Sequence, residues 1–169
     1  MEIVSPTDIT PYIQQLSELL ASCVDLDSSI GFLPPLTREQ AQAYWQIVNQ
    51  ELEQQSKIMF LMTSQDQIVA CVQLALVGKT NGLHRAEIEK LMVCKTARDK
   101  GVATLLMQAL EAKAKQLNRS LLVLDTRKGD PASSLYLKLG YQVAGEIPHF
   151  ALSASGSLDA TVYFYKELK

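Results

Sequence analysis

The chain has few cysteines and lacks a long apolar run. Its three cysteines, Cys23, Cys71 and Cys94, lie far apart in 169 residues, a spacing that matches neither a disulfide framework nor a set of zinc ligands. We therefore expect a reducing, cytoplasmic location and no bound metal. No stretch reaches the roughly 18 apolar residues of a membrane span, and the first residues lack the basic segment and apolar run of a signal peptide. We expect no membrane partner.

Excess positive charge is also missing. The 16 basic residues are outnumbered by 18 acidic ones, for a formal net charge of -2, whereas a dedicated nucleic-acid binder usually carries a basic excess. With 47% hydrophobic and 20% charged residues, the composition is that of an ordinary globular protein. The length favours one domain over residues 1–169 that buries its own core. We expect no nucleic-acid partner.

The first half of the chain predicts helices and then strands. Apolar residues from Ile13 to Cys23 are spaced for one face of a helix, and Thr37 with Gln40 forms a capping box for a second helix. Residues 57–78 read as two strands joined by the polar turn SQDQ, which is a hairpin. Another strand follows over residues 84–95. Strict alternation places Ile88, Lys90 and Met92 on one side of that strand and Glu87, Glu89, Leu91 and Val93 on the other.

The second half predicts a strand, a helix and a parallel strand. Gly101 opens a long amphipathic helix, and residues 119–126 form a short apolar strand after it. A further helix has Pro131 in its first turn and Gly140 at its C-terminal end, and strands begin at Tyr141 and at Ala160. This order predicts an α+β fold, a mixed α/β domain. The apolar face of the long helix is expected to bury Val102, Leu105, Leu106, Ala109, Leu110 and Leu117.

The start of the long helix predicts an anion site. Unpaired backbone N–H groups and the helix dipole attract anions at a helix N-terminus, and Gly101 and Ala103 permit a close approach to the backbone. Arg98 and Lys100 add positive charge, which suits a diphosphate better than a neutral ligand. A capped helix with solvated charges would show the same short pattern, so the pattern alone leaves both interpretations open.

The surrounding sequence resembles one enzyme family. The segment RDKGVA at residues 98–103 follows the strand EIEKLMV and precedes a helix, and this arginine-x-x-glycine-x-small pattern resembles that of the GNAT superfamily of N-acetyltransferases. Residues 124–148 are similar to the family's next strand, its tyrosine-bearing helix and the glycine-aromatic step after it. Within the superfamily the chain resembles bacterial tabtoxin resistance proteins, through IGFL at residues 30–33, NGLHRAEIEKLMV at 81–93, LLVLDT at 121–126 and TVYFYKEL at 161–168.

The resemblance implies a GNAT-like fold, with a central mixed, mostly antiparallel twisted sheet flanked by helices, and acetyl-coenzyme A (acetyl-CoA) as co-substrate. It implies that the pyrophosphate binds the amides from Asp99 to Thr104 and that the pantetheine arm pairs along Leu91 to Val93, as an added strand would. Ala103 stands where glycine is frequent in the family. The expected cofactor-binding residues are Leu91, Met92, Val93, Arg98, Asp99, Lys100, Gly101, Val102, Ala103 and Thr104.

Three residues are candidates for catalysis. Acetyl transfer to an amine needs a deprotonated nucleophile and an acid for the departing thiolate. The resemblance implies that Tyr136 is this acid, although spacing alone would make it a core aromatic residue. Asp125 could orient Tyr136, take a proton from the amine, or cap a turn. Glu87 matches a strand glutamate that some superfamily members use as a base; Glu89 is its rival, and both could be solvated surface charges.

The acceptor site is expected in loops, where specificity commonly resides. The candidate regions are residues 28–37, residues 148–158 and the neighbourhood of Tyr44 and Trp45, with Trp45 itself expected in the core. His149 could line this site. Nothing in the sequence pairs Cys94 with a histidine, which favours direct transfer over an acetyl-cysteine intermediate.

The sequence therefore predicts an acetyl-CoA-dependent N-acetyltransferase that acts by direct transfer on a primary amine of a small molecule. An amino-acid-like toxin or antibiotic is the narrowest version of this prediction. The alternatives are a protein or peptide N-acetyltransferase and a catalytically inactive sensor of coenzyme A, although the presence of both Asp125 and Tyr136 weighs against the sensor. A monomer and a homodimer remain equally open.

Overall fold

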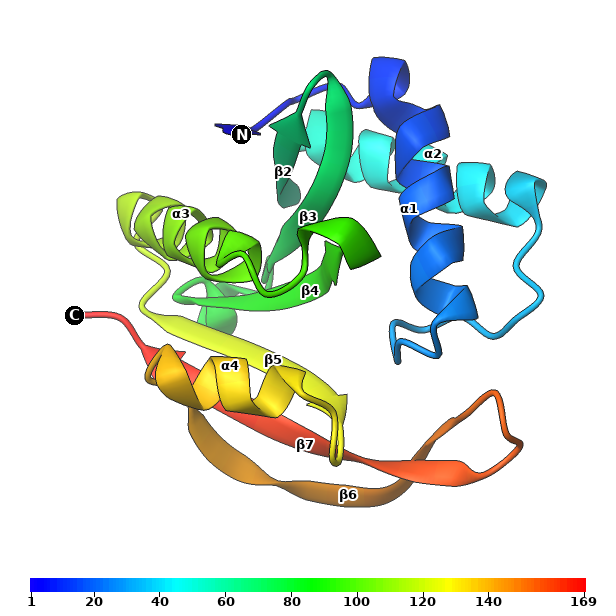
Figure 1. Cartoon of the computed structure of the whole chain (residues 1–169). Coiled ribbons are helices and arrows are strands. Elements are labelled where there is room, and N and C mark those ends of the chain that lie inside the picture. The colour runs from blue at the N-terminus through cyan, green and yellow to red at the C-terminus, as the bar shows by residue number, and fades with distance from the viewer.

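The computed structural model describes residues 1–169 and contains one seven-stranded sheet in the order β1-β2-β3-β4-β5-β7-β6, with four α-helices (Figure 1). The strands are β1 (Glu2–Val4), β2 (Lys57–Ser64), β3 (Gln67–Leu76), β4 (Arg85–Val93), β5 (Leu121–Arg127), β6 (Gln142–Leu152) and β7 (Leu158–Glu167), and the helices are α1 (Ile13–Asp25), α2 (Arg38–Glu53), α3 (Val102–Gln116) and α4 (Ala132–Lys138). Only β4 and β5 pair in parallel. The predicted mixed, mostly antiparallel α/β class is confirmed.

Helices cover both faces of the sheet. Figure 1 shows α1 and α2, in blue and cyan, on one side and α3 and α4, in green and orange, on the other. The alternation of β2 divides its side chains between two cores: Met59 packs toward α1 and α2, whereas Phe60 packs toward α3. Trp45 of α2 is 0% exposed in the first of these cores, which confirms its predicted structural place. No helix is long and apolar enough to cross a membrane.

The predicted capping box and glycine positions are present. Thr37 and Gln40 exchange side-chain to backbone hydrogen bonds at the start of α2, and Gly140 follows α4 with a φ of 86°. The predicted buried face of α3 was wrong at two residues. Leu105 is 47% exposed and Leu117 is 36% exposed, because the buried stripe follows positions four apart along the helix and Leu117 lies beyond its last residue. The fully buried residues of this helix are Val102, Leu106, Met107, Leu110 and Ala114.

A bulge in β4 corrects the predicted alternation of that strand. Cys71 of β3 faces Met92 and Gln73 faces Glu89, so β4 has one residue more than β3 over this stretch. Lys90 lies in the bulge with a φ of 50°. As a result Ile88 packs in the core beneath α3, whereas Met92 packs in the core beneath α1. The two residues therefore face opposite sides of the sheet, contrary to the prediction.

The parallel strands β4 and β5 stay paired over a short distance only. Their register runs from Arg85–Leu121 to Glu87–Val123 and then ends. Beyond Glu87, β4 keeps its partner β3 on one edge, and its other edge has no strand beside it. The strands diverge here, and α3 begins next to the opening (Figure 1).

Candidate active site

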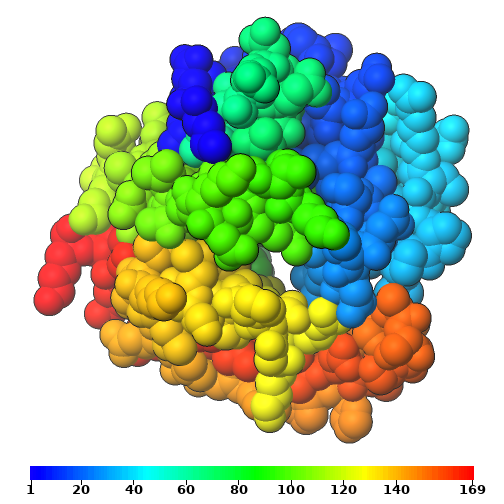
Figure 2. All heavy atoms as spheres, in the orientation of Figure 1, coloured from blue at the N-terminus to red at the C-terminus, as the bar shows by residue number.

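A cleft of about 1300 Å³ lies at the divergence of β4 and β5. Its walls come from the end of α1 and the loop after it, from the second half of β4, from the start of α3, and from β5, α4 and the β6–β7 hairpin. Figure 2 shows the surface hollowed where the green, yellow and blue segments meet. Segments from both halves of the chain thus form one continuous cavity.

One end of the cleft is the N-terminus of α3. Gly101, the N-cap residue, has a φ of 75°, and a Cβ added to it would meet nothing within 4 Å. The first hydrogen bond of the helix is donated by the Leu105 amide to the Gly101 carbonyl at 3.1 Å, so the amides of the first turn have no partner inside the helix. Arg98, three residues before Gly101, donates a 3.2 Å hydrogen bond from its Nε to the carbonyl of Val93 at the end of β4. This end of the cleft is suited to a phosphate group.

The unpaired edge of β4 forms the floor of the cleft. Leu91, Met92 and Val93 all line it, next to the helix start. No strand pairs with this edge, so its backbone groups, apart from the Val93 carbonyl that accepts from Arg98, are open to an extended ligand. Of the ten residues predicted to bind the cofactor, only Lys100 does not line the cleft. Asp99 lines it with an exposed side chain.

Tyr136 is a core aromatic residue that also lines the cleft. Its ring packs against Tyr141 and Phe164, with centroids 6.0 and 5.7 Å away, and the residue is only 6% exposed. Burial, together with the negative charges of Asp125 and Asp130, raises the pKa of Tyr136 to about 12. The phenol therefore keeps its proton at neutral pH, as a proton donor must.

Asp125 lies inside β5 and not at its end, which rules out the turn-cap alternative. It pairs with Tyr163 of β7 across the sheet, and its carboxylate accepts a 2.7 Å hydrogen bond from the Thr161 hydroxyl. The side chain is exposed to the cleft. Because its hydrogen-bond partner is Thr161, any influence of Asp125 on Tyr136 is exerted by its charge.

Glu87 and Glu89 both line the cleft but differ in their partners. Glu89 forms a 2.9 Å ion pair with Lys57, whereas Glu87 has none. Partial burial raises the pKa of Glu87, and the nearby charges of Glu89 and Asp125 raise it further. A carboxylate with a raised pKa is a better proton acceptor. The raised pKa and the absence of an ion pair therefore make Glu87 better suited than Glu89 to act as a base.

Comparison with known proteins identifies the family. The profile of the Acetyltransferase (GNAT) family matches residues 20–141. This chain belongs to the GNAT acetyltransferase family. An N-acetyltransferase from Staphylococcus aureus Mu50 has a TM-score of 0.82 at 15% identity, with 100% of both chains covered. The yncA protein of Salmonella typhimurium, described with its cofactor acetyl-CoA, has a TM-score of 0.81 at 12% identity, with 100% of this chain and 95% of that one covered.

A third similar structure is an aminoglycoside 6'-acetyltransferase type Ii, with a TM-score of 0.73 at 21% identity and coverage of 99% of this chain and 97% of that one. At these identities the likeness concerns the fold. The predicted GNAT-like fold is thus confirmed, from the family profile together with the structures.

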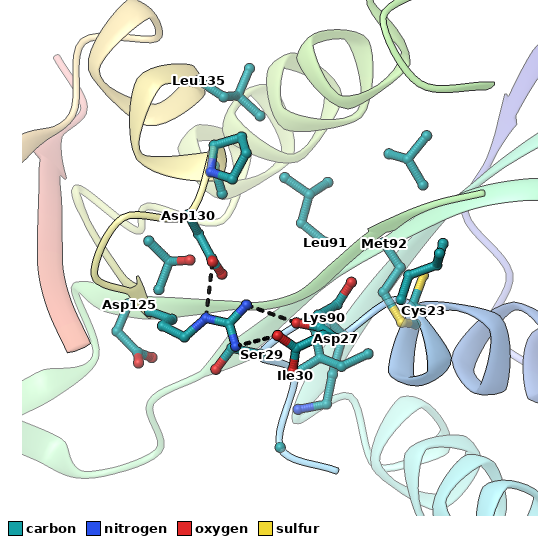
Figure 3. A pocket seen from close by; sticks show the side chains of 18 of the residues that line it. Cys23, Asp27, Ser29, Ile30, Lys90, Leu91, Met92, Asp125, Asp130 and Leu135 are labelled. Atoms are coloured by element: carbon teal, nitrogen blue, oxygen red, sulfur yellow. Dashed lines mark hydrogen bonds and ion pairs between the residues drawn. The ribbon is translucent and has the colours of Figure 1, made fainter. Parts of the chain in front are cut away.

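The other end of this GNAT cleft contains an ion cluster that the sequence analysis missed. Arg127, at the end of β5, pairs with Asp27 and Asp130 at 3.0 Å and with Asp159 at 3.7 Å. Dashed lines in Figure 3 mark the interactions of this cluster, and the labelled Asp27 and Asp130 lie on different sides of them. The signal in the sequence was an arginine two residues after Asp125 and three before Asp130, but its other partners, Asp27 and Asp159, lie in distant segments. Lys90 was also missed as a site residue, because β4 carries several other charged residues and the lysine does not stand out among them.

The predicted acceptor regions meet at this end only in part. Residues 28–34 and 150–154 line the cleft, and Trp45 does not. His149 and His84 are exposed and lie outside the lining. Cys94 has its sulfur 3.3 Å from the Thr96 hydroxyl, and its side chain has no hydrogen bond to a histidine. No group of three or more His, Cys, Asp or Glu side chains is placed to hold a metal ion.

Proposed function

We propose that this GNAT protein is an acetyl-CoA-dependent N-acetyltransferase that moves the acetyl group directly to a primary amine of a small molecule. One observation carries the proposal: a single cleft joins a helix N-terminus suited to phosphate, an unpaired strand edge, a protonated tyrosine and two carboxylates without cationic partners. Each of these features meets one requirement of the reaction.

The residues present fit acetyl-CoA. The amides of the first turn of α3 and the Arg98 guanidinium would hold the pyrophosphate, where the missing Cβ of Gly101 leaves room. The backbone of Leu91 to Val93 would hold the pantetheine arm. When bound, the coenzyme supplies the activated acetyl thioester. The Salmonella protein, with its cofactor acetyl-CoA, supports this assignment.

Side chains of this protein would carry out the proton transfers. Glu87 would take the proton from the acceptor ammonium, with Asp125 as the second carboxylate at the amine position. Tyr136 would donate its phenolic proton to the departing thiolate. Glu87→Gln and Asp125→Asn distinguish the contributions of the two carboxylates.

The shape of the acceptor end favours a small molecule over a protein chain. The ion pair between Arg127 and Asp27 ties the end of α1 to β5, and residues 28–34 and the β6–β7 hairpin line the same end. An extended peptide would need an open groove there. The aminoglycoside acetyltransferase supports an antibiotic amine, and the resemblance to tabtoxin resistance proteins supports an amino-acid-like toxin.

The test is thiol release from acetyl-CoA with a panel of amino acids, amine antibiotics and peptides, with mass spectrometry of each acceptor. We expect turnover with a small amine and gain of one acetyl group. Preferential turnover of the peptides would favour the protein-directed alternative. Tight binding of acetyl-CoA with no thiol release from any amine would refute the enzyme and favour the coenzyme A sensor.

A further inference from the structure

Lys90 extends into the acceptor end of the cleft because of the bulge in β4. The additional residue turns Lys90 to the face that carries Glu89, and Lys90 lines the cleft with Glu87. Its ammonium lies 5.7 Å from the ring centroid of Tyr44 and 5.9 Å from that of Phe32. The loop after α1 is close to this ammonium, because a Cβ added at Gly31 of the loop would lie 3.5 Å from Lys90 Nζ; Figure 3 labels Lys90 together with Ser29 and Ile30 of the same loop.

The ammonium of Lys90 has no anionic partner in the protein. Four cationic residues line the cleft: Lys90, Arg98, Arg127 and Lys138. Arg127 binds three carboxylates, Arg98 lies at the helix start, and Lys138 is in the last turn of α4. Lys90 is therefore the cation without an ion pair at the acceptor end. By contrast, the nearby Lys57 is 2.9 Å from both Glu51 and Glu89.

The ammonium of Lys90 is partly desolvated, and the protein stabilises its charge only in part. Burial lowers the pKa of Lys90, and the charges of Glu89 and Asp125 offset part of this effect. The two aromatic rings stabilise the cation by an interaction that is weaker than an ion pair. A buried cation gains most from an anion that arrives with its own hydrogen-bond acceptors.

The same cleft also contains negative charges without ion-pair partners. Glu87 and Asp125 line the same cleft without cationic partners, and under the proposed function they receive the amine of the acceptor. A ligand with an ammonium and a carboxylate would satisfy all three side chains. We propose that Lys90 is a specificity-determining residue that binds a carboxylate of the acceptor, so that the substrate class is an amino acid or another amine that bears a carboxylate. This inference rests on the proposed function.

The experiment compares acceptors that differ only in the carboxylate, with L-lysine and 1,5-diaminopentane as one pair and L-phenylalanine and phenethylamine as another. Wild-type kcat/KM, from thiol release, is expected to be about 10- to 100-fold higher for the acid of a pair, the size of one charge-assisted hydrogen bond. In Lys90→Met this preference is expected to collapse, and Lys90→Arg is expected to restore part of it. Lys115→Met, which removes an exposed lysine of α3, is the matched control and should keep the preference.

Equal kcat/KM for acid and amine in the wild type would overturn the inference without need of any variant, as would a preference that Lys90→Met retains. If no amine is acetylated, the proposed function fails separately. The inference is then decided by calorimetry with coenzyme A bound, using N-acetylglycine and N-acetylglycinamide as probes. Binding of the acid alone, lost in Lys90→Met, supports it; binding of both probes equally, or of neither, overturns it.

Discussion

Arg127 donates hydrogen bonds to the carboxylate and to the backbone carbonyl of Asp27, at 3.0 and 2.8 Å, across 100 residues of sequence. The contact joins the end of α1 to the end of β5 and thereby fixes the loop that lines the acceptor end of the cleft. The same arginine holds Asp130 and Asp159, so one guanidinium organises three chain segments around the site.

Asp27→Ala is expected to raise the KM of the acceptor and to leave the KM of acetyl-CoA unchanged, because it frees the acceptor loop and not the helix start. The free energy of unfolding should fall by less than about 1 kcal/mol, since the Asp27 side chain is 57% exposed. Steady-state kinetics and urea denaturation measure both effects. Asp25→Ala, which changes an exposed acid at the last residue of α1 that has no ion pair, is the control; an equal change in both variants would contradict the role of Asp27.

Gly101→Glu is expected to weaken acetyl-CoA binding sharply, because it places a negative side chain where phosphate must approach the backbone. The added Cβ meets no atom within 4 Å, so folding should survive, although the positive φ of 75° disfavours any side chain. Gly101→Ala separates the two effects: it has the backbone cost, about 1–2 kcal/mol, without the charge. Calorimetry measures the Kd, and an unchanged Kd in folded Gly101→Glu would refute the phosphate assignment.

Tyr136→Phe is expected to lower kcat by about 10²–10⁴-fold, the usual loss for one positioned acid, while the Kd of acetyl-CoA changes little. The ring keeps its contacts with Phe164, so the melting temperature of the variant should be close to that of the wild type. Tyr141→Phe is a matched control, because Tyr141 packs against Tyr136 but does not line the cleft. If Tyr136→Phe had full activity at every pH where the wild type is active, Tyr136 would have a structural role only.

Asp125→Asn is expected to reduce turnover while folding and cofactor binding persist. Asparagine still accepts the hydrogen bond from Thr161, but it lacks the charge and the basicity. Thr161→Val tests the other half of this contact, since it removes the donor and leaves the carboxylate. Kinetics combined with thermal denaturation separate the roles: normal turnover in stable Asp125→Asn would show that the charge is dispensable.

The pH profile should reveal Glu87. A base works only when deprotonated, and the pKa of Glu87 is raised above its ordinary 4.5, so activity should be lost as the pH falls through that raised value. Asp125→Asn should move this acid limb to lower pH, because it removes one of the charges that raise the pKa of Glu87. Glu87→Gln should abolish the limb together with most activity. Glu89→Gln should instead cost stability, since Glu89 pairs with the buried Lys57; a persistent limb in Glu87→Gln would assign the base elsewhere.

Local features of the sequence determined most elements and one end of the site. A capping box, a glycine at a left-handed position and apolar residues three and four apart act over a single turn of chain, so Thr37, Gly101 and Leu106 could be interpreted without knowledge of the rest. The helix start that we assign to phosphate is of this kind. The parallel crossover spans a longer segment, but it could be predicted from the order of strand, helix and strand, each of which has its own local pattern.

Tertiary structure alone decided the acceptor end. The bulge that turns Lys90 into the cleft exists because β4 pairs with β3 in one register, and alternation within β4 cannot reveal it. The partners of Arg127 come from the loop after α1, the β5–α4 loop and β7, and a salt bridge leaves no periodic signal in the sequence. Contacts of this kind depend on which distant segments the fold brings together, whereas the helix start depends only on neighbouring residues.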